Sequence, residues 1–160
     1  MKTKKQVKKK KKPLIQKVKK KVKKKITVTE LKKKAWRLCS EYIRRKYASK
    51  RGIVKCVTCG KISHWKYMQA SHLVPGRTNG ILFDERGIYP ACVGCNIFKS
   101  GNLHSYMRFL ENKLGIDEAR ALRDELIANS KEPIKLTTFD LEMLIVKYKD
   151  LLEDLKKQGR

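Results

Sequence analysis

The sequence predicts an α+β fold, in which a small zinc-stapled core of short strands is flanked by an N-terminal helix and by C-terminal helices. Three observations support this prediction. Two Cys-x2-Cys pairs enclose a stretch of short apolar pieces and turns, apolar residues recur at helical spacing on either side of that stretch, and residues 1–25 hold 15 lysines and no acidic residue. We expect three parts: a lysine-rich arm at residues 1–28, a core region at 29–115 and a helical segment at 116–160.

Charge is the feature that indicates a partner. The 160 residues carry a formal net charge of +26, of which residues 1–25 hold +15, residues 26–110 hold +12 and residues 111–160 hold −1. Lysine and arginine gain affinity for nucleic acids by releasing counterions condensed on the phosphates. Like-charge repulsion and few apolar groups predict that residues 1–28 form a disordered nucleic-acid-binding arm in the free protein. A solubilising or localisation tail is the alternative.

A membrane surface is the main rival partner for so basic a chain. No apolar run in the sequence approaches the roughly 20 residues that span a bilayer, and the first residues lack the apolar stretch of a signal peptide. We therefore expect no membrane partner and a cytoplasmic location, where cysteine thiols stay reduced.

The N-terminal helix is predicted at residues 30–48. Thr29 is the expected N-cap, and Glu30 complements the dipole of the first turn. Cys39 has no Cys or His at ligand spacing and is expected to be a small core residue. It belongs to a stripe of apolar residues at helical spacing that predicts the buried face, namely Leu31, Ala35, Leu38, Cys39, Tyr42 and Ile43.

Three further helices are predicted after the cysteine-rich stretch. The first runs from Leu103 to Leu114 and is closed by Gly115. The second is capped by Asp117, ends near Ala128 and has Ala121, Leu122 and Leu126 on its inner face. The third starts at Thr137 or Thr138 and carries an apolar stripe over residues 141–155, which either forms a dimer interface or packs within the chain.

The two cysteine pairs are the strongest motif in the sequence. Cys56 and Cys59 form the first pair, Cys92 and Cys95 form the second, and 32 residues separate them. Zinc binds four thiolates in a tetrahedron, and each pair supplies two from a tight turn. A redox pair or unconnected cysteines are the alternatives. With four thiolates the zinc has no open position for a substrate, so the expected role is structural.

The residues between and just after the cysteine pairs suit phosphodiester chemistry. His72 follows an alternating stretch, residues 67–71, which predicts a short strand. A neutral imidazole is a suitable general base near pH 7; a core or zinc-adjacent histidine is the alternative. Asn96 directly follows Cys95, so its side-chain oxygen could ligate a hard cation from a fixed backbone. A helix-capping Asn is the alternative. Lys99 lies one turn later and could contact phosphate or remain solvated.

These motifs resemble those of known nucleases. A histidine at the end of a strand, followed by a zinc knuckle that runs into Cys-Asn, is similar to HNH nucleases with embedded zinc, such as phage endonuclease VII. Over residues 34–122 the chain more closely resembles the lambdoid phage NinG (Rap) family of recombination endonucleases. The matching pieces are Ala35-Trp36, Tyr42-Ile43-Arg44, Cys56-x2-Cys59-Gly60, Gln69-Ala70-x-His72, Phe83-Asp84-Glu85, Cys92-x2-Cys95-Asn96, Ser100-Gly101-Asn102 with Tyr106, and Leu114-Gly115.

The resemblance implies a ββα-metal (HNH) core that makes residues 29–115 a nuclease domain around the structural zinc. It implies that His72 activates the attacking water and that Asn96 ligates a catalytic Mg²⁺ or Mn²⁺. If a phage encodes the chain, its location is the host cytoplasm. The implied substrates are branched recombination intermediates such as D-loops and four-way junctions, and other recombination proteins or a second copy of the chain could be partners.

Two positions depart from the HNH pattern. Ser71 stands where many HNH enzymes carry a second metal ligand, so that ligand is unassigned; Asp84, Glu85 or His104 could supply it, and we favour Asp84. Gly87 stands where an Asn usually braces the loop behind the base, and this change could weaken activity.

The leading hypothesis is therefore a metal-dependent, structure-selective DNA endonuclease. The alternative is a non-catalytic zinc-ribbon protein that binds DNA or RNA with a decayed HNH pocket. A ribosome-associated basic protein would explain the lysines but not His72 and Asn96. Six basic residues near the motifs are expected to contact the DNA backbone, and they are Arg44, Arg45, Arg51, Lys61, Arg77 and Arg86.

Overall fold

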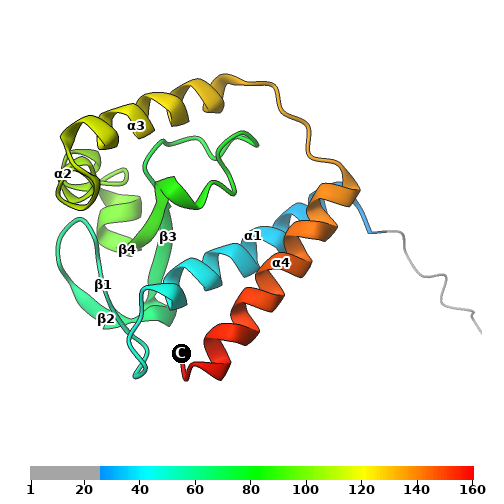
Figure 1. Ribbon diagram of the computed structural model, residues 1–160, viewed down its shortest axis with the longest axis horizontal. Helices are drawn as coiled ribbons and strands as arrows, with labels where there is room; N and C mark the ends of the chain where they lie inside the picture. Colours follow the sequence, from blue (N-terminus) through cyan, green and yellow to red (C-terminus); the bar gives the residue numbers. More distant parts are fainter. Residues whose placement is uncertain (1–25) are drawn as a thin grey trace, which may run out of the picture.

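The computed structural model describes residues 26–160, so nearly all of the predicted arm lies outside the described residues. Figure 1 shows a pair of long helices, α1 and α4, on one side of short strands, with α2 and α3 on the other side. This mixture of helices and small sheets confirms the α+β class. The elements are α1 (Val28–Lys46), β1 (Ile53–Lys55), β2 (Ile62–His64), η1 (Trp65–Tyr67), β3 (Met68–His72), η2 (Glu85–Gly87), β4 (Ile88–Cys92), the π-helix η3 (Gly94–Phe98), α2 (Leu103–Leu114), α3 (Ile116–Lys131) and α4 (Thr138–Lys157).

The strands form two antiparallel pairs, β1 with β2 and β3 with β4. In the second pair Met68 lies opposite Cys92 and His72 lies opposite Ile88. The strand predicted before His72 is thus confirmed, and His72 is its last residue. Because β4 ends at Cys92 and η3 begins two residues later, the strand pair leads directly into a short helix.

Helix α1 begins earlier than the sequence analysis predicts. Its N-cap is Thr27, not Thr29, because Thr27 and Glu30 form a capping box. The Thr27 hydroxyl accepts from the backbone N–H of Glu30 at 3.2 Å, and the Glu30 carboxylate accepts from the backbone N–H of Thr27 at 2.8 Å. Each group satisfies a donor that the first turn of the helix leaves without a partner. The helix ends at Lys46 rather than at residue 48.

Of the C-terminal helices, α2 has the predicted bounds, and α4 begins at Thr138, one of the two predicted starts, with Thr137 as its N-cap. Helix α3 differs: Gly115 takes the N-cap position instead of Asp117, and the helix continues to Lys131. Its buried residues are Ala119 and Leu126, whereas the predicted inner residue Ala121 is exposed. No helix within residues 26–160 has both the length and the apolar character needed to cross a membrane.

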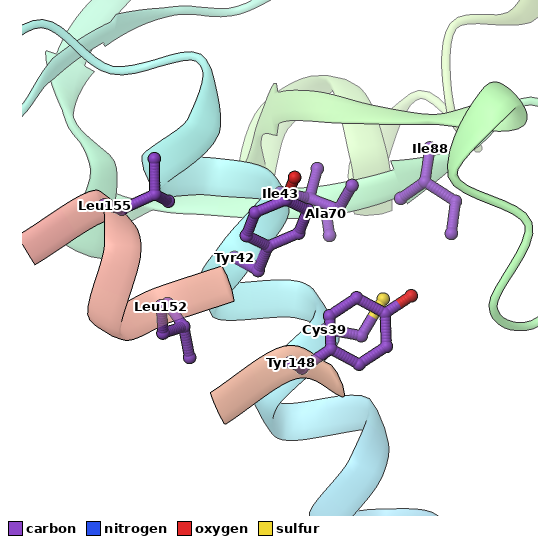
Figure 2. Packing of buried hydrophobic residues seen from close by; sticks show 8 residues of the cluster. All are labelled: Cys39, Tyr42, Ile43, Ala70, Ile88, Tyr148, Leu152 and Leu155. Atoms are coloured by element: carbon purple, nitrogen blue, oxygen red, sulfur yellow. The ribbon is translucent and has the colours of Figure 1, made fainter. Parts of the chain in front are cut away.

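The apolar stripe of α4 packs against α1 within the chain. Figure 2 shows Tyr148, Leu152 and Leu155 of α4 facing the α1 side chains, with the strand residues behind them. The stripe is therefore buried in the core and is not a free dimer surface. Cys39 is fully buried in this cluster, as predicted, and burial raises the pKa of its thiol to about 12, which makes it a poor nucleophile.

Tyr106 of α2 holds the end of β3 to η2, the turn that precedes β4. Its buried hydroxyl lies 2.9 Å from the carbonyl oxygen of Ser71 and 3.1 Å from that of Gly87, and donates to these acceptors. A Cβ at Gly87 would lie 2.6 Å from Cδ1 of Leu126, so this glycine is what lets α3 approach the loop. Leu126 therefore leaves no room for a larger side chain at position 87, and Tyr106 holds this loop to the end of β3.

Candidate metal centre and the adjoining cavity

The four cysteines of the two pairs come together as predicted. Their Sγ atoms all lie within 4.8 Å of one another, and the Sγ atoms of Cys59 and Cys92 are 3.7 Å apart. A zinc ion with tetrahedral bonds of about 2.3 Å would place its sulfur ligands about 3.8 Å apart. None of the four cysteines forms a disulfide. The donor set and its spacing therefore fit a single zinc ion.

The local backbone explains why the sulfurs converge. Cys56 follows β1, and Gly60 turns the chain at a positive φ of 77°, with its N–H donating to the carbonyl of Cys56 at 3.0 Å. From the second pair, the backbone N–H of Cys92 lies 3.3 Å from Cys56 Sγ. Burial alone would raise the pKa of Cys56, but hydrogen bonds from Thr58 and from backbone N–H groups lower it to about 6. These bonds favour the thiolate of Cys56. At Cys59 a backbone hydrogen bond from Lys61 lowers the pKa, but burial and the three neighbouring thiols raise it to about 12, so without a cation only part of the cluster favours the thiolate form.

A cavity of about 650 Å³ adjoins the cysteine cluster, and both His72 and Asn96 line it. The first comes from the end of β3 and the second from η3, immediately after Cys95. The cysteine cluster ties β4 and η3 to the β1 end of the chain, so it fixes the element that carries Asn96. The other lining residues are Trp36, Ser40, Arg44, Met68, Gln69, Ala70, Pro75, Gly76, Arg77, Ile97, Ser100, Gly101 and Leu103.

His72 is held on two sides. Its ring stacks on Trp36 with centroids 4.9 Å apart, and Nε2 lies 3.2 Å from the carbonyl oxygen of Leu82. A carbonyl can only accept, so the neutral ring carries its proton on Nε2 and leaves Nδ1 as the basic atom. Burial lowers the pKa of His72, the hydrogen bond to Leu82 opposes this, and nearby Arg77 lowers it further. The ring is therefore neutral at pH 7.

Asn96 is oriented by a neighbour on β3. Its Nδ2 donates to Oε1 of Gln69 at 2.6 Å. This bond uses the amide nitrogen and leaves the carbonyl oxygen of Asn96 available as a ligand or an acceptor. His72 and Gln69 are on the same strand, so one strand sets the positions of both the imidazole and the carboxamide.

The acidic candidates for the second metal ligand lie elsewhere. Asp84 caps η2 and binds Arg86 at 2.7 Å, and Glu85 pairs with Lys46 and Lys147. Within residues 26–160 no Asp or Glu lines the cavity. Asp84 borders only a separate small void together with His72. The structure therefore does not bring Asp84 together with Asn96. The carboxylate of Asp84 instead caps η2 and forms an ion pair with Arg86.

Ser71 and His104 do not line the cavity either. Ser71 is 1 % exposed, and its hydroxyl oxygen has no hydrogen-bond partner among the described residues. Its side chain is thus enclosed in the protein core. His104 is exposed on the first turn of α2.

Some of the basic residues predicted to contact DNA are bonded to other groups of the protein, and others are exposed. Arg44 lines the cavity, but its guanidinium donates to the carbonyls of Ser40, Trp65 and Met68. Arg77 also lines the cavity and lies over the Trp36 ring at 4.5 Å. Arg45 pairs with Glu41, Arg86 pairs with Asp84 and Glu125, and Arg51, Lys61 and Lys99 are exposed. Arg77 is therefore the predicted contact that is best placed for a phosphate in the cavity.

Two residues of the site received no role in the sequence analysis, Trp36 and Gln69. Both occur in the motifs that carry the family resemblance, which was the only signal for them. Their roles as a stacking platform and an orienting acceptor depend on α1 lying across β3, and that packing is a tertiary feature.

Comparison with known proteins decides the family. A family model described as "NinG: Bacteriophage Lambda NinG protein" matches residues 1–158. The chain belongs to the NinG family. This NinG chain is 31% identical to "Protein ninG" of Salmonella phage P22 over 101 residues, which are 63% of this chain and 47% of the relative.

Two further relatives show similar agreement. "Protein ninG" of Escherichia phage 933W is 30% identical over 101 residues (63% of this chain, 48% of the relative). That of Escherichia phage lambda is 27% identical over the same length (63% and 47%). The NinG chain thus spans about half the length of the curated relatives it matches. No solved structure matches it.

Proposed function

We propose that this NinG-family chain is a metal-dependent, structure-selective DNA endonuclease with an HNH-type site. One observation carries the proposal: a neutral imidazole and a free carboxamide oxygen line the same cavity beside a four-thiolate cluster. The order of elements also supports it, since an antiparallel strand pair leads into a short helix, as a ββα-metal core requires. Here that helix is a five-residue π-helix.

The proposed mechanism assigns one role to each side chain of the cavity. Nδ1 of His72 takes a proton from the attacking water while Nε2 stays bonded to Leu82. Trp36 keeps the imidazole in place by stacking, and Arg77 contacts the scissile phosphate. A catalytic Mg²⁺ or Mn²⁺ would polarise the phosphate and stabilise the charge on the leaving oxygen. Asn96, oriented by Gln69, would hold that ion through its carboxamide oxygen.

The donor set of the cavity has a consequence for metal affinity. Magnesium in proteins is usually bound through one or two carboxylates together with substrate phosphates. The described residues that line this cavity offer only neutral ligands, so the DNA phosphate would have to supply the negative charge. We therefore expect the catalytic ion to bind tightly only together with DNA.

The same observation favours a second candidate function, a non-catalytic zinc-ribbon protein that binds DNA or RNA. A cavity without a carboxylate among its described residues is what loss of the catalytic metal would leave. Against this candidate, the hydrogen bond from Asn96 to Gln69 and the stacking of His72 preserve an oriented pair that simple binding does not need.

Branched DNA is the proposed substrate class because of the NinG family resemblance and the charge distribution. Residues 26–110 carry a net charge of +12, and residues 111–160 carry −1. A backbone-directed surface of this kind reads the shape of DNA rather than its sequence. Symmetric cutting of a four-way junction needs two active sites, so a homodimer stays a prediction; it would have to use a surface other than the buried stripe of α4.

The test compares a labelled four-way junction with a linear duplex of the same sequence, with Mg²⁺ or with Ca²⁺. We use Ca²⁺ rather than a chelator because a chelator would also remove zinc from the cysteine cluster. The proposal predicts cutting near the branch with Mg²⁺ only. Binding without cutting under both conditions would favour the non-catalytic alternative.

The pH dependence of cutting is expected to report His72. A base must be neutral to act, and burial together with Arg77 lowers the pKa of His72 below its ordinary value of 6.5. The value of kcat/KM should therefore be constant near pH 7 and fall only when the pH drops below 6.5. Arg77→Gln should move this acid limb to higher pH. An acid limb centred above pH 6.5 would contradict the assignment.

Deletion of residues 1–25 is expected to weaken DNA binding and flatten its salt dependence. The 15 lysines of this segment would release counterions on binding, and each neutralised phosphate contributes about −0.9 to the slope of log K against log salt. The matched variant keeps the length and changes these lysines to glutamine. A slope that stays the same in both variants would show that the segment does not contact the phosphates.

A further inference from the structure

The segment between the second cysteine pair and α2 exposes an unusual amount of apolar surface. Phe98 is 81 % exposed, more than any other large hydrophobic residue of the described chain, and its neighbour Ile97 is 55 % exposed. Ile97 and Leu103 both line the cavity that holds His72 and Asn96. The apolar crest formed by Ile97, Phe98 and Leu103 therefore stands at the rim of the candidate active site.

Hydrogen bonds hold the backbone of this crest in place. The N–H of Lys99 donates to the carbonyl of Gly94 at 3.0 Å, and the N–H of Gly101 donates to that of Cys95 at 2.9 Å. Ser100 and Asn102 adopt positive φ values of 46° and 50°, which non-glycine residues keep only where the surrounding structure enforces them. An exposed aromatic ring on such a support loses little entropy when it binds a partner.

The charge around the crest identifies the kind of partner. Residues 86–110 contain no acidic side chain, and the exposed Lys99 follows Phe98 directly. An apolar ring beside a cation, in a segment without acidic residues, matches a ligand with flat apolar faces on an anionic backbone. Nucleic acids have this combination only where bases are unstacked, because in a continuous duplex the base faces are covered.

We propose that Phe98 stacks on a nucleobase that is unstacked at the branch point, and so gives the cavity its preference for branched over linear DNA. This inference rests on the DNA binding in the proposed function but not on cleavage. Lys99 holds the adjoining phosphate, and Ile97 and Leu103 pack along the base or sugar while the scissile phosphate enters the cavity. A linear duplex offers no free base face, so it binds through its phosphates alone.

The test measures binding of the full chain to a four-way junction and to a linear duplex of the same sequence, in Ca²⁺. The junction carries 2-aminopurine at the branch, whose fluorescence reports stacking. Phe98→Ala is compared with Phe98→Trp, which restores a stacking ring, and with Phe139→Ala, which removes a 69 % exposed phenylalanine from α4. Zinc content and thermal unfolding check that each variant is folded.

Phe98→Ala should lose about five- to hundredfold in junction affinity, the range found when a base-stacking aromatic is truncated. Its duplex affinity should change less than about threefold, and its fluorescence change at the branch should vanish. Phe98→Trp and Phe139→Ala should keep the junction preference.

Equal binding of both DNAs by the unmodified chain, or an unchanged preference in Phe98→Ala, would overturn the inference. A chain that prefers the junction through Phe98 but never cuts it would support the inference and refute the endonuclease. A chain that binds neither DNA would refute both.

Discussion

His72→Ala is expected to reduce cutting of branched DNA by about a hundred- to ten-thousandfold, the usual contribution of a general base. Its affinity for the same DNA should stay nearly unchanged. The reason is that the proposed mechanism has the imidazole act on water through Nδ1 and hold no phosphate, and assigns the DNA contacts to Arg77 and the exposed cations. Single-turnover cleavage in Mg²⁺ and binding in Ca²⁺ measure the two effects separately.

Two controls sharpen this result. His72→Gln keeps a donor for the carbonyl of Leu82 but cannot accept a proton at pH 7, so it should be as inactive as His72→Ala. His64→Ala removes a half-buried histidine that does not line the cavity, and it should cut normally. An equal loss of binding and cutting in the His72 variants would mean that the residue is structural.

Cys92→Ser is expected to lose zinc and to unfold the region around β1 to β4. Binding of a structural zinc is worth about 10 kcal/mol or more, which matches or exceeds the whole stability of a typical domain. Cys92 also lies in a buried cluster with Val54, Met68 and Cys95, so its loss separates β1 from β4. Zinc content per chain and thermal unfolding by circular dichroism measure the effect.

The matched control for this variant is Cys39→Ala. It removes a cysteine that is also buried but belongs to the α1 and α4 core, away from the cluster. We expect it to lose about 1–2 kcal/mol of stability, as for other small core truncations, and to keep its zinc. A Cys92→Ser protein that is folded and free of zinc would show that the cluster does not support the fold.

Local signals in the sequence predicted most of the helices. Gly115, with a φ of 99°, ends α2 where predicted, and Thr137 with Asp140 forms the capping box of α4. The predicted start of α1, after Thr29, is wrong, although the sequence contains the capping motif that marks the true start. The spacing of Thr27 and Glu30 is that of a capping box, and it outranks the isolated Thr29. The predicted cap of α3, Asp117, is also wrong, because Gly115 is both the C-cap of α2 and the N-cap of α3.

The site was predictable where spacing alone determines it. The four cysteines converge because two short turns can each hold two sulfurs. The position of Asp84 could not be predicted in this way. Its partner Arg86 also binds Glu125 of α3. The Arg86–Glu125 pair joins residues 39 positions apart, so it depends on how α3 packs on the loop, and no local sequence pattern predicts it.

The most direct test of the account is a crystal structure of the chain with uncleaved branched DNA and Mn²⁺, in which anomalous scattering locates the ion. We predict one Mn²⁺ in the cavity, bound to the carboxamide oxygen of Asn96 and to the scissile phosphate, with Nδ1 of His72 facing a water beside that phosphate. A phosphate bound outside the cavity, or an ion held by other side chains with His72 and Asn96 free, would contradict the proposed active site.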